Sequence, residues 1–195
     1  MEEDELVRKL IAAQIECLSK MDPDDWHYIA HIHNWGDELD VLYWIVSQPE
    51  CDKATARLLF WKGEPTCYVF EECEEVMGES SYSVEPLLKH IADRFRNHCF
   101  RREEIKFDIH EAIIGDPVYM ARDDRSDSDY GMDAEFKELK DRSAEQGRPG
   151  VTFPDDLLVT HTPGRWISRY TYELRSAAPY PWSVDFETGA LIYEN

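Results

Sequence analysis

Histidines near the start of the chain have the spacing of metal ligands. His27 and His31 are four residues apart, one turn apart on one side of a helix. Asp24 or Asp37 would add a carboxylate to such a site. No glutamate follows His27 as in a zinc protease. We therefore interpret these histidines as packed helix residues, and keep a metal-dependent hydrolase using His27, His31 and an aspartate as the alternative.

Two further patterns resemble functional sites less closely. Residues 124–135 have the length of a calcium-binding loop and end at Glu135, but the sixth position is Asp129 rather than glycine. Adjacent side chains on a helix point apart, so we expect Cys99 to pack and His98 to face solvent. The sequence contains no serine-hydrolase, P-loop or dinucleotide-binding motif. We therefore predict no catalytic residues, no resident metal and no cofactor.

Carboxylates dominate the chemistry of this sequence. Its 195 residues include 41 acidic and 21 basic residues, a formal net charge of −20, and residues 1–80 carry 19 of the acidic groups against 6 basic ones. Such a chain repels phosphate backbones, which argues against nucleic acid, and attracts cationic proteins. We predict a basic protein partner that binds two acidic clusters and two tryptophans, namely Asp37, Glu38, Asp40, Glu71, Glu72, Glu74, Glu75, Trp166 and Trp182.

Two simpler explanations of the acidic surplus remain open. Clustered carboxylates can keep a protein soluble without binding anything. Basic residues later in the chain can also neutralise the acidic surface from within, and this group comprises Lys89, Arg94, Arg96, Arg101, Arg102 and Lys106.

Five helices are predicted in the first half of the chain. Asp22, Asp37 and Asp52 are the expected N-caps of three of them. Residues 38–47 are apolar on nearly every side, which is typical of a helix at the centre of a bundle. The predicted helices cover residues 4–19, about 23–33, 38–47, about 53–62 and 84–95, the last with Ser83 as N-cap.

The pattern changes after about residue 103. Alternating apolar residues predict strands over 105–114 and 168–175 and a terminal hairpin within 184–193, and residues 133–146 resemble a surface helix. Residues 66–81 fit either a strand or a helix. We predict an α+β fold that is mainly α, with a helical domain over 1–103 and a β-rich part over 104–195 that ends in the hairpin.

Compartment is indicated by the cysteines and by the apolar runs. The five cysteines include no C-x-x-C pair, which favours reduced thiols in a cytoplasm. The acidic start at Met1–Glu5 differs from a cationic signal peptide. The longest apolar run, Val41–Val46, is too short to span a membrane. We expect a cytoplasmic protein that does not bind membranes.

The stretch from Trp26 to Trp61 carries a family resemblance. It contains His33-Asn34-Trp35 with Asp37, then Pro49-Glu50-Cys51-Asp52, Ala54-Thr55-Ala56 and Phe60-Trp61. These motifs resemble bacterial domain-of-unknown-function family 4274 over roughly residues 26–105. The resemblance implies a compact, mainly helical module and brings no established activity or catalytic residue. Gly36-Asp37-Glu38 departs from the family's acidic pair followed by glycine, so the turn after Trp35 is expected to differ.

Together these observations favour an acidic cytoplasmic binding protein that sequesters a basic partner, concretely a toxin-neutralising immunity-type protein. The alternatives are the metal-dependent hydrolase and an accessory or regulatory domain with an unidentified ligand.

Overall fold

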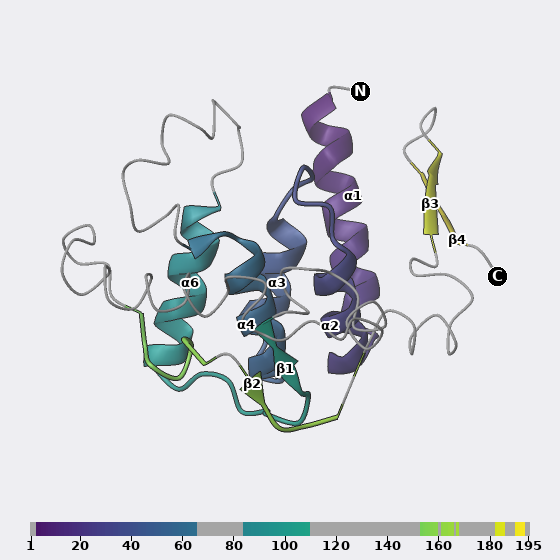
Figure 1. Ribbon diagram of the computed structural model, residues 1–195. Helices are drawn as coiled ribbons and strands as arrows, with labels where there is room; N and C mark the ends of the chain where they lie inside the picture. Colours follow the sequence, from purple (N-terminus) through teal and green to yellow (C-terminus); the bar gives the residue numbers. More distant parts are fainter. Residues whose placement is uncertain are drawn as a thin grey trace, which may run out of the picture.

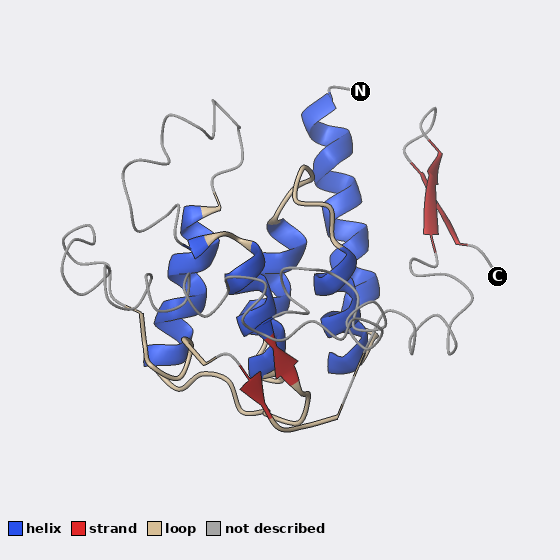
Figure 2. Cartoon of the chain, in the orientation of Figure 1, coloured by secondary structure: helices blue, strands red, loops and turns tan. Residues whose placement is uncertain are grey.

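The protein is mainly helical, as the sequence predicts (Figures 1 and 2). The computed structural model describes residues 3–65, 84–109, 153–159, 161–165, 167, 182–185 and 190–193. Its helices are α1 (Glu3–Leu18), α2 (Pro23–Ile32), α3 (Asp40–Ser47), α4 (Lys53–Lys62) and α6 (Glu85–Arg96). No described helix combines the length and apolar composition needed to cross a membrane.

Local capping signals place the start of α2 where the sequence predicts it. The Asp22 carboxylate accepts hydrogen bonds from the backbone N–H groups of Asp24 and Asp25, at 2.8 and 3.0 Å. The Asp25 carboxylate in turn accepts from the Asp22 N–H, which completes a capping box, and Pro23 occupies the first turn. The N-terminus of α2 is therefore stabilised by its own sequence.

Replacing Asp22 by alanine is expected to lower the free energy of unfolding by about 1 kcal/mol, because the variant loses the side-chain cap and little else. Urea denaturation monitored by circular dichroism measures this change. A loss above about 2 kcal/mol would contradict a purely local role, since that is the upper end for a helix cap.

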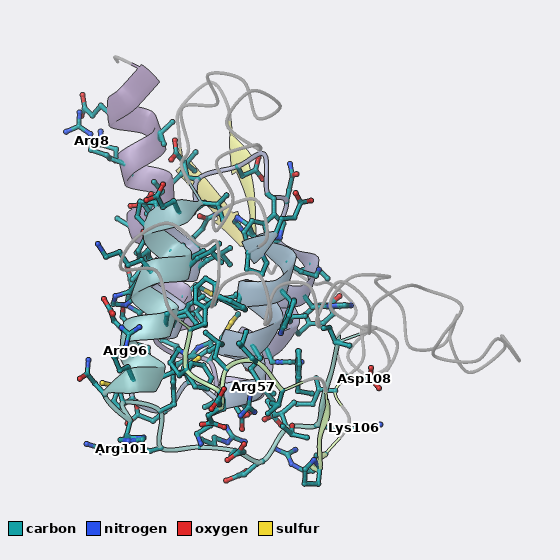
Figure 3. The ribbon with its side chains drawn as sticks, turned by 60° about the vertical axis from the view of Figure 1, so that its left-hand side comes forward. Arg8, Arg57, Arg96, Arg101, Lys106 and Asp108 are labelled. Atoms are coloured by element: carbon teal, nitrogen blue, oxygen red, sulfur yellow. The ribbon has the colours of Figure 1, made fainter. Side chains whose placement is uncertain are left out.

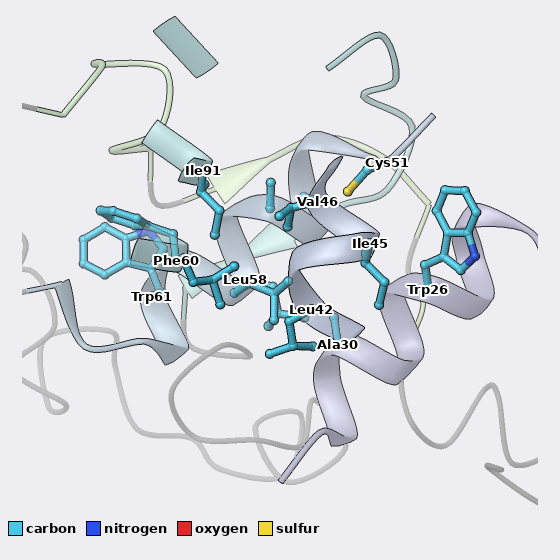
Figure 4. Close-up of a cluster of buried hydrophobic side chains, with 14 of the residues drawn as sticks. Trp26, Ala30, Leu42, Ile45, Val46, Cys51, Leu58, Phe60, Trp61 and Ile91 are labelled. Carbon is cyan, nitrogen blue, oxygen red and sulfur yellow. The ribbon is translucent and has the colours of Figure 1, made fainter. Parts of the chain in front are cut away.

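The centre of the helical body is α4, not the helix at 38–47 that the sequence favoured. Every residue from Ala54 to Trp61 is buried, whereas Tyr43 and Trp44 of α3 are half-buried and its two end residues are exposed. Apolar side chains of α2, α3, α4 and α6 meet around α4 (Figure 4). The sequence did not predict this arrangement because α4 contains the polar residues Thr55 and Arg57. Both form hydrogen bonds inside the fold, which allows them to be buried.

The β-rich C-terminal part is not supported. β1 (Phe107–Asp108) pairs antiparallel with β2 (His161–Thr162). β3 (Trp182–Asp185) pairs antiparallel with β4 (Ala190–Tyr193), and this pair overlaps the hairpin predicted within 184–193. The alternation at Ile105, Phe107 and Ile109 instead reflects burial of a short extended segment in the helical core. The expected elements at 66–81, 133–146 and 168–175 lie outside the described residues.

Candidate functional site

One predicted acidic cluster lies between α2 and α3. Asp37 and Asp40 are exposed and Glu38 is half-buried. None of the three forms an ion pair with a lysine or arginine in the described part of the chain. Asp37 does not cap α3, whose N-cap is Leu39 without a side-chain hydrogen bond. Its carboxylate instead accepts a hydrogen bond from the Asn34 side-chain amide at 3.2 Å, which orients it at the turn.

The other predicted partner-binding residues are not placed by the structure. Trp182 belongs to β3, and its side chain is not described. The remaining residues lie outside the described ranges, and they are Glu71, Glu72, Glu74, Glu75 and Trp166.

The acidic cluster after α2 lies at the end of the helical body where α2 and α4 both end. His27 of α2 contacts Thr55 of α4, and the His31 backbone carbonyl accepts a hydrogen bond from Lys62, so the two helices run in the same direction. Both therefore end on the side where Asp37 follows α2 (Figure 1). The end of α4 and the start of α6 also meet, because a Cβ on Gly63 would contact Val84 and Leu88, and residues 66–83 between them lie outside the described ranges. We call this side the acidic end.

The histidines occupy the interface between α2 and α4. His27 is 2% exposed, and its Nδ1 lies 3.0 Å from the Thr55 hydroxyl. Burial, reinforced by the nearby His31, lowers the pKa of His27 to about 3, so its ring is neutral at physiological pH. Within the described ranges no group of three or more His, Cys, Asp or Glu side chains is arranged to hold a metal ion. Asp24, one carboxylate considered for such a site, binds two arginines.

Asp24 is an internal counter-ion at the opposite end of α2. The Arg165 guanidinium donates to both of its carboxylate oxygens, at 2.8 and 2.9 Å, and Arg102 donates to one of them at 2.9 Å. Burial alone would raise the pKa of Asp24, but the hydrogen bonds and charges of Arg165 and Arg102 hold it below its usual range. The predicted internal neutralisation by the basic group is therefore present at Arg102.

Asp52 is also used internally, at the start of α4. One carboxylate oxygen caps the helix by accepting the Ala54 N–H at 2.9 Å, as the sequence predicts. The other accepts the backbone N–H groups of Glu104 and Ile105, at 2.7 and 3.2 Å. Asp52 is fully buried, so these contacts join the start of α4 to the segment that follows α6.

A second charged site, around Arg57, is one that the sequence reasoning did not identify. Arg57 is 1% exposed and donates through its two terminal nitrogens to Glu103 at 3.1 Å and to Asp156 at 2.7 Å. The Lys53 ammonium pairs with the same two carboxylates, 3.2 Å from that of Glu103 and 3.0 Å from that of Asp156. The sequence feature that could have indicated this site is Arg57 itself, a single charged residue within the mostly apolar stretch from Ala54 to Trp61. Figure 3 places Arg57 towards the end of the molecule where Arg101 also lies.

The paired residues His98 and Cys99 do not form a reactive pair on a helix. They follow the end of α6, and His98 adopts a positive φ of 52° in the turn. His98 is exposed and Cys99 is half-buried, in agreement with the expected division of roles. The segment resembling a calcium loop, 124–135, lies outside the residues that the structure covers.

Comparison with known proteins identifies the helical module. Residues 21–96 match the model of a family described as "Domain of unknown function (DUF4274)", which confirms the resemblance noted in the sequence. The matched segment includes α2, α3, α4 and α6, and therefore both the acidic cluster after α2 and the Lys53–Arg57 pair. Searches of curated proteins and of solved structures found no match.

Proposed function

We propose that this chain is an acidic, cytoplasmic binding protein that sequesters a basic protein partner, in the manner of a toxin-neutralising immunity protein. The proposal rests on the contrast between the two ends of α2. Asp24 is neutralised by arginines, whereas the carboxylates at Asp37, Glu38 and Asp40 have no lysine or arginine partner among the described residues. Surface carboxylates that are not paired internally attract a cationic protein and raise its rate of association.

The mechanism would be occlusion of the partner's functional surface. The acidic end provides the initial attraction, extended by the glutamates at 71–75, and aromatic side chains such as Trp166 and Trp182 anchor the complex. No covalent bond is broken in such a reaction, which accords with the absence of a catalytic motif from the sequence. The partner itself can be sought by retention from a lysate at low salt followed by elution at high salt.

The triple variant Asp37→Asn, Glu38→Gln, Asp40→Asn tests the surface directly. We expect it to associate with the partner about tenfold more slowly at low ionic strength, because three steering charges are removed. The dissociation rate should change much less. Stopped-flow or surface plasmon resonance measurements at several salt concentrations separate the two rates.

A matched control removes three charges elsewhere. Glu5 pairs with Lys9 on α1, Glu16 pairs with Lys20 just after α1, and Asp93 pairs with Arg96 on α6. The variant Glu5→Gln, Glu16→Gln, Asp93→Asn therefore has the same net charge as the test variant. Equal slowing by both variants would refute a specific surface and leave only the net charge. Failure to recover a basic partner at any salt concentration would refute the function itself.

A further inference from the structure

A short segment from beyond the matched module lies across one end of the helical body. Residues 153–159, 161–165 and 167, which we call the strap, follow the green trace at the lower edge of Figure 1. Leu157 and Leu158 are buried in the core formed mainly by the helices. Phe153 packs its ring against that of Phe60 in α4, with the ring centroids 4.8 Å apart. The strap thus inserts apolar side chains beside α4.

The surface that receives the strap carries two positive charges. Lys53 and Arg57 both bind the Asp156 carboxylate, and the Arg57 Nε–H also donates to the Asp156 backbone carbonyl at 3.0 Å. We call Lys53, Arg57 and Phe60 the seat. All three belong to the segment that matches the family, whereas Asp156 does not. The module therefore presents a cationic and apolar surface to which this chain supplies the occupant.

The far end of the strap is held by an unusually close approach of two backbones. Gly164 has a φ of +156°, and a Cβ atom there would lie 2.5 Å from the Ile105 carbonyl carbon and 2.5 Å from the Lys106 nitrogen. Only glycine fits this contact. The Arg165 N–H donates to the Glu104 carbonyl at 2.7 Å, and the Lys106 N–H donates to the Arg165 carbonyl at 2.8 Å.

The polar contacts at the rim of the strap are open to water. The side chains of Glu103, Asp156 and Arg165 are 43%, 49% and 52% exposed. Their partners Arg57 and Asp24 are buried or nearly so, but because one member of each pair reaches water, the pairs are partly screened by salt. The described strap also contains no helix, and its strand β2 is two residues long. Segments with few backbone ties can open separately from the core that they cover.

From these contacts we propose that the strap opens as a unit, and that the seat beneath it is a binding site for an acidic segment of a partner protein. The ligand chemistry is that of the strap itself, an aspartate followed by two leucines. The aspartate binds Lys53 and Arg57, and the leucines fill the apolar space beside α4. The charged part of this site, Lys53 and Arg57, lies in the first half of α4, away from the acidic end, and the inference does not depend on the function proposed above.

The variant Gly164→Ala tests the proposal without altering a charged group. Its new methyl group pushes the strap away from residues 104–106, and the seat becomes accessible. A labelled synthetic peptide with the sequence of residues 153–167, which keeps the glycine, is expected to bind this variant at least tenfold more tightly than it binds the wild type. The wild-type strap is tethered and competes at a high effective concentration. Fluorescence anisotropy measures both affinities.

Hydrogen exchange on the same proteins shows whether the strap opens separately. In Gly164→Ala we expect faster exchange at the amides of Leu157, Arg165 and Lys106, with exchange of the α4 amides unchanged. Gly36→Ala is the matched control, because a Cβ there meets its nearest atom, in Asn34, at an ordinary 3.5 Å. It should leave both exchange and peptide binding at wild-type values.

Two altered peptides test the chemistry of the seat. The Asp156→Asn peptide should lose most of its affinity because it no longer neutralises Lys53 and Arg57. A peptide carrying Gly164→Ala should also bind poorly. If Gly164→Ala does not fold, Arg165→Ala replaces it, because the half-exposed Arg165 side chain can be truncated without opening the core.

Three results would overturn the proposal. The first is exchange of the strap amides only together with those of α4. The second is an open strap with no peptide binding, in which case the seat is not a transferable site. The third is dimerisation of the variant in size-exclusion chromatography, which would assign the seat to the strap of a second copy.

Discussion

Replacing Asp52 by alanine is expected to lower the free energy of unfolding by about 3 kcal/mol. About 1 kcal/mol comes from the lost N-cap of α4. The rest arises because the N–H groups of Glu104 and Ile105 lose their shared acceptor, and at least that of Ile105 is buried. Urea denaturation followed by circular dichroism measures the loss, which is a large part of the stability of an ordinary domain.

Two variants separate the cap of Asp52 from its second contact. Asp22→Ala removes a helix cap that has no such additional partners, so its loss of about 1 kcal/mol is the reference value. Asp52→Asn keeps one carbonyl oxygen but places an NH₂ group opposite a backbone donor. Its loss in free energy of unfolding should therefore lie between those of the two alanine variants. If Asp52→Ala and Asp22→Ala lower the free energy of unfolding by the same amount, Asp52 stabilises the protein only as a helix cap.

The sequence could predict features that depend on residues close together in the chain, such as helix caps. Asp22 and Asp52 lie directly before helical patterns and cap them as expected. The same reasoning was wrong for Asp37, because α3 begins only at Asp40 and the Asn34 amide competes for the carboxylate. A cap is determined by the few residues around it, so a neighbouring hydrogen-bond donor is enough to change the outcome.

What the sequence could not predict was the long-range pairing of charges. Asp24 binds Arg165, which lies 141 residues away, and Arg57 binds Asp156, 99 residues away. No local pattern marks such partners. The hydrophobic pattern therefore predicted the wrong central helix. The polar residue Arg57 of α4 can be buried because acidic groups from distant segments pair with it. Of the residues proposed to bind a partner, the structure describes the side chains of Asp37, Glu38 and Asp40, which lie together after α2, and their role stays a prediction.

The acidic residues of the helical module thus divide by position. Asp24 and Asp52 lie in or directly before the first turns of α2 and α4, where helix dipoles and backbone donors favour negative charge, and distant residues complete their contacts. Asp37 and Glu38 lie between α2 and α3, and Asp40 lies in the first turn of α3, but none of the three has a lysine or arginine partner among the described residues. Net charge alone does not distinguish these groups. The second group is the one that we propose to bind a partner, which makes its neutralisation the informative experiment.

Acid should destabilise the protein through the buried His27. Its folded-state pKa of about 3 lies below the usual unfolded value of about 6.5, so the unfolded chain binds a proton that the folded chain excludes. This contribution to stability is fully present above about pH 6.5 and is lost as the pH falls towards 3. Between pH 7 and 4.5 we expect His27 to account for a loss of about 2.5 kcal/mol.

The pH dependence of a glutamine variant isolates this contribution. Urea denaturation of His27→Gln at a series of pH values should give a curve flatter than the wild type by that amount, whatever its absolute stability. Burial also lowers the pKa values of His33 and His90, so both proteins keep some acid sensitivity from them. Equally steep losses in His27→Gln and the wild type would show that the α2–α4 interface admits the proton, contrary to the burial of His27.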